Sequence, residues 1–181
     1  NPFAFLENIH ILEHIDRLVE IFNACWPMYA AMPAVLKDAI ERSYQKVGWD
    51  LRNSESEKGI FPTFFDLLDI LPGVIEESHY SKDTQSDYVG ALCTRVKSLT
   101  NGIYGSVLCA EDALSDAEMF DQNVIVDLSR VGSMETKSLL MGILVMKLQE
   151  YRMCSSGMNS RLRHVTVLEE AHNLLRKTSA E

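Results

Sequence analysis

Two adjacent carboxylates, Glu169 and Glu170, follow a short apolar run that extends from His164 to Leu168. A short run rich in Val and Thr is typical of a buried strand, and open α/β sheets bind their ligands at the carboxyl ends of their strands. One carboxylate at such a place can hold Mg²⁺, and the next can orient or deprotonate an attacking water. The acidic first turn of an ordinary helix would give the same pattern, so these residues alone favour catalysis only slightly.

A second polar cluster follows a second apolar run. Residues 123–128 predict a buried strand, and Ser133 is a suitable N-cap for a long helix that reaches Tyr151. Strand, helix and strand form a βαβ unit, whose strands are parallel and whose crossover is right-handed. This arrangement would bring five polar residues to one edge of the sheet: Asp127, Ser129, Arg130, Glu169 and Glu170.

The phosphate-binding loop G-x-x-x-x-G-K-[ST] does not occur in the sequence, and the chain begins at Asn1 rather than Met. We therefore expect an internal piece of a longer protein that carries only half of an active site. Without backbone amides and a lysine to hold the phosphates, no ATP or other cofactor is expected to bind this piece alone.

The first part of the chain, residues 13–105, reads as helices joined by short turns. The third helix is expected to end at Pro72-Gly73, and the polar stretch 53–59 is expected to be a connection between helices. The first three helices are predicted at 15–22, 33–48 and 62–71, and the fourth is expected to follow residues 81–84 and to end near Asn101-Gly102.

Composition restricts the class of protein. The 181 residues are 46% hydrophobic, but no apolar run approaches the ~20 residues that span a bilayer. No contact with a membrane is therefore expected. The four cysteines are scattered, which fits a reducing cytoplasm. The net charge is −9, and residues 1–94 hold 15 acids but 7 bases. A uniformly basic DNA-binding surface is thereby excluded, and the local patch 95–102 is better explained as a solvated helix end.

Several segments resemble one family. Residues 165–175 resemble the Walker B segment of the HerA/FtsK-like ATPases, which are hexameric, DNA-translocating P-loop motors, and residues 123–133 resemble the strand that precedes it. The opening 1–5 is similar to an Asn-Pro-Phe turn that leads into a helical insertion in bacterial HerA-like proteins. Residues 13–16 and 21–26 resemble the start of that insertion.

The resemblance implies an α/β fold: part of a parallel P-loop NTPase sheet of the RecA/FtsK type with a large all-helical insertion. The implied divisions are an edge of the ATPase core (1–12), a helical insertion lobe (13–105) and an ATPase core segment that includes the Walker B strand (106–181). The parent protein would be an ATP- and Mg²⁺-dependent DNA translocase or helicase in the cytoplasm. Its partners would be DNA, further copies of itself in a hexamer, and a nuclease or other effector.

By the family pattern, Glu169 would take the metal-side position and Glu170 the water-activating one. Three residues are candidates for contact with the nucleotide, and each has a structural alternative. Arg130 could act as an arginine finger or form a surface salt bridge, Ser129 could bind near the phosphates or cap the turn, and His172 could sense the nucleotide or simply pack.

The sequence also allows a protein-interaction module and suggests a di-iron site. The acidic helical half could be a non-catalytic protein-interaction module of a larger ATPase. A di-iron site is suggested by three Glu-x-x-His pairs, but one pair precedes the first helix and another follows a strand-like run, which is the wrong geometry for a four-helix cage. Trp26 and Trp49 have no flanking basic residues, so we interpret them as core and interface aromatics rather than base-stacking platforms.

Overall fold

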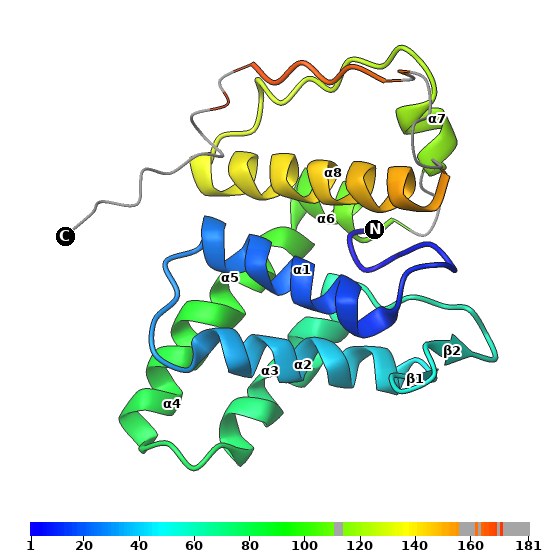
Figure 1. The fold of residues 1–181 in the computed structure, drawn as a ribbon. Coiled ribbons are helices and arrows are strands. Elements are labelled where there is room, and N and C mark those ends of the chain that lie inside the picture. The colour runs from blue at the N-terminus through cyan, green and yellow to red at the C-terminus, as the bar shows by residue number, and fades with distance from the viewer. Residues whose placement is uncertain (111–113, 156–161, 163, 170, 172–181) are drawn as a thin grey trace. The chain divides into compact units, whose positions relative to one another are not determined.

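The structure is a computed structural model that describes residues 1–110, 114–155, 162, 164–169 and 171. The chain divides into two compact units, each with its own packing (Figure 1). Unit 1 comprises residues 1–19 and 28–113, and unit 2 comprises residues 20–27 and 114–181.

Helices dominate the described residues. Helix α1 (Ile11–Cys25) begins in unit 1 and ends in unit 2. Unit 2 also contains α7 (Asp116–Phe120) and α8 (Met134–Ser155). The remaining elements belong to unit 1: α2 (Met32–Lys46), β1 (Trp49–Asp50), β2 (Glu55–Ser56), α3 (Phe64–Glu77), α4 (Lys82–Tyr88), the π-helical turn η1 (Val89–Cys93), α5 (Thr94–Thr100) and α6 (Gly102–Leu108).

The predicted α/β fold with a parallel P-loop sheet is wrong for the described residues. Their sheet has two strands, β1 and β2, which pair antiparallel as a hairpin. Residues 123–128 and 164–168 have no helical or strand assignment, because no backbone hydrogen bond joins them to a neighbouring described strand. An apolar β-branched run sets a local preference, but a strand forms only where a partner satisfies its N–H and C=O groups.

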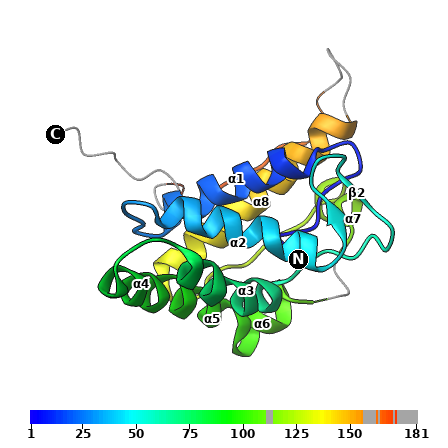
Figure 2. The same cartoon turned by 90° about the horizontal axis from the view of Figure 1, so that it is seen from below.

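The predicted helices of the first part are confirmed as α1, α2, α3 and the continuous helical run 82–100, which includes η1. The long helix predicted after Ser133 is confirmed as α8. The predicted end of α3 is wrong, because the helix continues through Pro72 to Glu77. Proline removes one intrahelical hydrogen bond, but Leu71, Val74 and Ile75 are buried on either side of it and hold the helix against its neighbours. Helix α3 packs against both α2 and α5 (Figure 2).

Phe3 anchors the N-terminal turn in the core of unit 1. Its ring is fully buried, 5.0 Å from the ring of Phe64 and 6.3 Å from that of Tyr44. The Tyr44 hydroxyl donates a hydrogen bond to the Phe3 carbonyl, and the Asn1 side-chain amide donates to the carbonyl of Pro62 at 2.9 Å. The Asn-Pro-Phe turn is thereby tied to both α2 and the start of α3.

The polar stretch 53–59 is part of a hairpin rather than a simple connection. Trp49 pairs with Ser56 and Asp50 with Glu55, and Ser54 takes a left-handed φ of 58° in the turn between the strands. Such a φ is tolerated at single turn positions. The Ser54 hydroxyl also accepts a hydrogen bond from the N–H of Ile11 at 2.9 Å, which ties the turn to the start of α1.

Among the helices that the structure describes, none combines the length and the apolar composition that crossing a bilayer requires.

Removal of the Phe3 side chain should destabilise unit 1 strongly. Because Phe3 is fully buried, Phe3→Ala should lower the free energy of unfolding by about 3–5 kcal/mol, from lost apolar burial and the cavity left behind. The matched control, Phe65→Ala, removes the same side chain from a site that is 55% exposed and should change it by no more than about 0.5 kcal/mol. Urea unfolding followed by Trp49 fluorescence measures both, and equal effects would contradict the anchoring role.

Candidate functional site

Glu169 lies at the end of an extended, exposed apolar segment. Residues 164–168 carry no regular secondary structure, and Val165 and Val167 are 71% and 80% exposed. Glu169 is itself exposed in a turn that follows directly. Its predicted partners Glu170 and His172 lie outside the described residues. The structure therefore places one of the two acids, at the end of an exposed apolar segment rather than of the predicted buried strand.

The second polar cluster is a tight turn after residues 123–128. The Asp127 carboxylate accepts a hydrogen bond from the N–H of Ser129 at 2.8 Å. This backbone hydrogen bond is the main cause of the lowered pKa of Asp127, and the Ser129 side chain adds to it. Ser129 and Arg130 are exposed, and Arg130 forms no ion pair with a described carboxylate. Both side chains are therefore accessible to a ligand.

The two apolar segments begin next to each other. The His164 Nδ1 lies 2.8 Å from the carbonyl oxygen of Phe120, and because a carbonyl only accepts, Nδ1 carries the proton. The guanidinium of Arg152, at the end of α8, donates to the same carbonyl at 2.5 Å and to the Asp121 carboxylate at 2.7 Å. Tyr151 also donates to Asp121. The end of α7, the end of α8 and the start of residues 164–168 are thus held at one point.

From this point both segments run along α8 toward its first turn (Figure 1). Ser133 caps that turn, and its hydroxyl accepts a hydrogen bond from the N–H of Thr136 at 3.3 Å. The predicted βαβ unit is therefore wrong for the described residues: its helix is present as α8, but residues 123–128 and 164–168 do not pair as strands. Among the described residues, no hydrogen bond or ion pair joins Glu169 to Ser129 or Arg130.

The carboxylate of Glu169 is an oxygen ligand of the kind that Mg²⁺ prefers. Within the described ranges, no group of three His, Cys, Asp or Glu side chains is placed to hold a metal ion by itself. Magnesium in nucleotide sites is commonly held by one or two carboxylates together with phosphates and water. The exposed carboxylate of Glu169 fits that kind of shared site.

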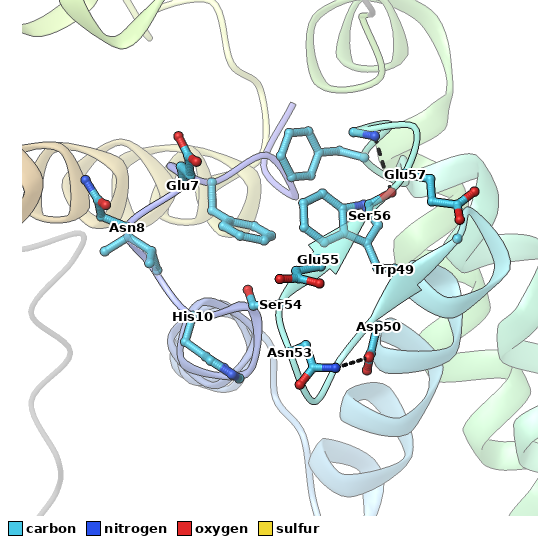
Figure 3. Close-up of a pocket in the computed structure, with 15 residues that line it drawn as sticks. Glu7, Asn8, His10, Trp49, Asp50, Asn53, Ser54, Glu55, Ser56 and Glu57 are labelled. Carbon is cyan, nitrogen blue, oxygen red and sulfur yellow. Dashed lines mark hydrogen bonds between the residues drawn. The ribbon is translucent and has the colours of Figure 1, made fainter.

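A hollow of about 1220 Å³ in unit 1 was not anticipated from the sequence (Figure 3). One wall is the N-terminal segment 5–10 and the other is the β1–β2 hairpin. Three half-buried aromatic rings form its floor, and the rings of Trp49 and Phe61 stack at 5.1 Å with an interplanar angle of 21°. Phe5 lies 5.1 Å from Trp49. Residues 55–61 hold two acids and a single aromatic residue, Phe61, and gave no signal of a groove, because pairing with residues 5–10 depends on tertiary contacts.

Two cysteines and one histidine of unit 1 lie in packed surroundings rather than in an open site. Burial raises the pKa values of the Cys93 and Cys109 thiols, which disfavours the nucleophilic thiolate. His14 is fully buried, with its Nε2 at 3.1 Å from the carbonyl oxygen of Pro2. These residues therefore serve packing and anchoring.

The chain matches none of the protein-family models, curated proteins or solved structures with which it was compared. The resemblance to HerA/FtsK-like ATPases accordingly rests on the sequence segments themselves.

Hydrogen exchange should distinguish extended, unpaired segments from strands. The amides of Val124, Val126, Val165 and Val167 have no described backbone acceptor, so they should exchange near the rate of an unstructured peptide. Amides in the buried part of α8, around Leu139 and Ile143, should exchange at least ~100-fold more slowly, since they open only by local unfolding. Mass-spectrometric exchange on this chain measures both sets. Equal protection in the segments and in α8 would show that the segments pair as strands after all.

Proposed function

We propose that this chain is part of an ATP-hydrolysing DNA translocase or helicase of the HerA/FtsK type, to which it contributes the acidic pair Glu169 and Glu170. The observation that supports this most directly is an exposed apolar segment that ends at an exposed carboxylate. A second such segment starts beside it at Phe120 and ends in the Asp127–Ser129 turn. Apolar side chains of this kind are ordinarily covered in a functional protein.

In this proposal the two acids have different roles. Glu169 holds Mg²⁺ together with the phosphates of ATP, and the ion neutralises charge on those phosphates. Glu170 orients or deprotonates the attacking water, which requires its carboxylate to be ionised and basic. The proposal requires a phosphate-binding loop elsewhere in the parent protein, since the motif G-x-x-x-x-G-K-[ST] does not occur in these 181 residues.

Three further residues are proposed to face the nucleotide. The exposed Arg130 guanidinium can pair with phosphate oxygens, since it has no described carboxylate partner. The Ser129 hydroxyl lies next to it in the same turn and can donate to an oxygen acceptor. His172, two residues after Glu170 in the sequence, is the third candidate.

The remaining proposals concern the parent protein. They are a homo-oligomer of the hexameric kind, a cytoplasmic location, DNA as the substrate of translocation and a nuclease or other effector as a partner. Because residues 1–94 carry 15 acids but 7 bases, contact with the DNA phosphates would come chiefly from other parts of the assembly.

A second candidate function is a protein-interaction module in unit 1. The observation that favours it is the hollow between residues 5–10 and the hairpin, which has an aromatic floor at the surface of a helical unit with its own core. The two functions are compatible in one parent protein.

The acidic pair can be tested in the parent protein by isosteric substitution. Glu170→Gln removes only a basic carboxylate, so ATP binding should stay nearly intact while turnover falls by ~10²–10⁴-fold, the usual contribution of a positioned general base. Glu169→Gln should instead raise the Mg²⁺ concentration needed for half-maximal activity, because the lost charge acts on the metal. Steady-state ATPase assays with and without DNA, over a titration of Mg²⁺, measure both effects.

A suitable control is Glu76→Gln, which makes the same chemical change at an exposed position of α3 in unit 1. It should leave both turnover and the Mg²⁺ dependence unchanged. Wild-type turnover in Glu170→Gln, in a parent protein that is an active ATPase, would contradict the catalytic role. The two acids would then only stabilise the first turn of a helix through its dipole.

A further inference from the structure

The hollow between residues 5–10 and the β1–β2 hairpin, here called the hairpin groove, combines an aromatic floor with an acidic border. Its floor consists of the half-buried rings of Phe5, Trp49 and Phe61. Its described lining residues include no Lys or Arg but four carboxylates: Glu7, Asp50, Glu55 and Glu57. Arg52 at the hairpin tip and Lys58 after β2 lie outside this lining.

The walls of the hairpin groove are held in place by specific bonds. Besides the Ser54–Ile11 hydrogen bond, His10 Nε2 lies 3.3 Å from the carbonyl oxygen of Arg52. The indole N–H of Trp49 donates to the carbonyl of Ile60 at 2.7 Å, which fixes the ring over Phe61. The groove is therefore a built feature of unit 1, with both walls tied to the same core.

The four carboxylates differ in how they are stabilised. Asp50 accepts hydrogen bonds from the N–H of Arg52 at 2.9 Å and from the side-chain amide of Asn53 at 2.6 Å, and these bonds, with the nearby charge of Arg52, lower its pKa. Glu7, Glu55 and Glu57 are exposed and form no ion pair with described residues. Figure 3 shows the Glu55 side chain in the space between the hairpin and residues 7–10, with Glu7 on the opposite wall.

We propose that the hairpin groove binds a basic peptide segment of a partner protein, with an Arg or Lys side chain lying against the Trp49 ring and its charge between Glu7 and Glu55. A guanidinium or ammonium group is attracted both to an aromatic face and to carboxylates, and its aliphatic stem covers apolar surface. A nucleic acid is disfavoured, because its phosphates would face the same carboxylates. This site is independent of the proposed ATPase function, since no residue of the acidic pair takes part.

The test uses the full 181-residue chain and two synthetic peptides, capped at both ends. One peptide alternates arginine and leucine, and the other has glutamate in place of every arginine. At low ionic strength the arginine peptide should bind and change the tryptophan fluorescence. The change is assigned to Trp49, because Trp49 lines the groove whereas Trp26 is buried and out of reach of the peptide. Added salt should weaken this binding because the carboxylates are exposed, and the glutamate peptide should not bind.

Two charge-matched variants locate the site. Glu7→Gln/Glu55→Gln should weaken binding of the arginine peptide by roughly 3- to 30-fold, the effect of losing two exposed ion pairs. Glu76→Gln/Asp87→Asn removes two exposed charges elsewhere in unit 1 and should leave the affinity unchanged. Calorimetric titration measures the affinities, and circular dichroism verifies that both variants fold.

Three results would overturn the proposal. The arginine peptide could fail to bind at low ionic strength, or the two variants could lose affinity equally, which would indicate general charge attraction. A single-stranded oligodeoxynucleotide that binds and changes Trp49 fluorescence as the peptide does would assign the groove to nucleic acid instead.

Discussion

The burial of Phe3 is the constraint on which unit 1 depends. Its ring lies against the rings of Tyr44 in α2 and Phe64 in α3, and its carbonyl accepts a hydrogen bond from the Tyr44 hydroxyl. Because this turn is fixed, residues 5–10 follow a defined path across the unit and meet the β1–β2 hairpin. The aromatic floor and the acidic border of the hairpin groove are consequences of that path. A side chain three residues from the start of the chain thus organises elements up to sixty residues away.

The second constraint is the obligation of backbone groups to find hydrogen-bond partners. Residues 123–128 and 164–168 have the composition of buried strands, yet their valine side chains are largely exposed in this chain. Their starts are held together by His164, Phe120 and Arg152, so they are placed in space although they are not paired. An apolar surface that ends at Glu169 and at the Asp127–Ser129 turn is the physical basis of the proposed ATPase role.

Local signals in the sequence predicted local structure. The apolar spacing and Pro33 located α2, and Ser133 located the start of α8. The end of α3 was predicted wrongly at Pro72, because the helix-breaking effect of proline is local. Burial of Leu71 and Val74 is a tertiary effect, and it keeps α3 intact. The parallel sheet was wrong for the same reason, since pairing needs a partner that no sequence pattern supplies. The functional role of the acids after residues 164–168 stays a prediction from the sequence. The hairpin groove was not predicted, because its two walls are about forty residues apart in the chain.

The central claim, that Glu169 and Glu170 face a nucleotide-bound metal ion, can be tested directly by metal-directed cleavage of the parent protein. Fe²⁺ replaces Mg²⁺ in many oxygen-ligand sites, and with ascorbate and peroxide it generates radicals that cut the nearest backbone. With ATP present, cleavage should occur around residues 168–171, should disappear in excess Mg²⁺ and should be lost in Glu169→Gln. ATP-dependent cleavage elsewhere that leaves residues 164–171 intact would contradict the account, because the metal would then lie away from the acidic pair.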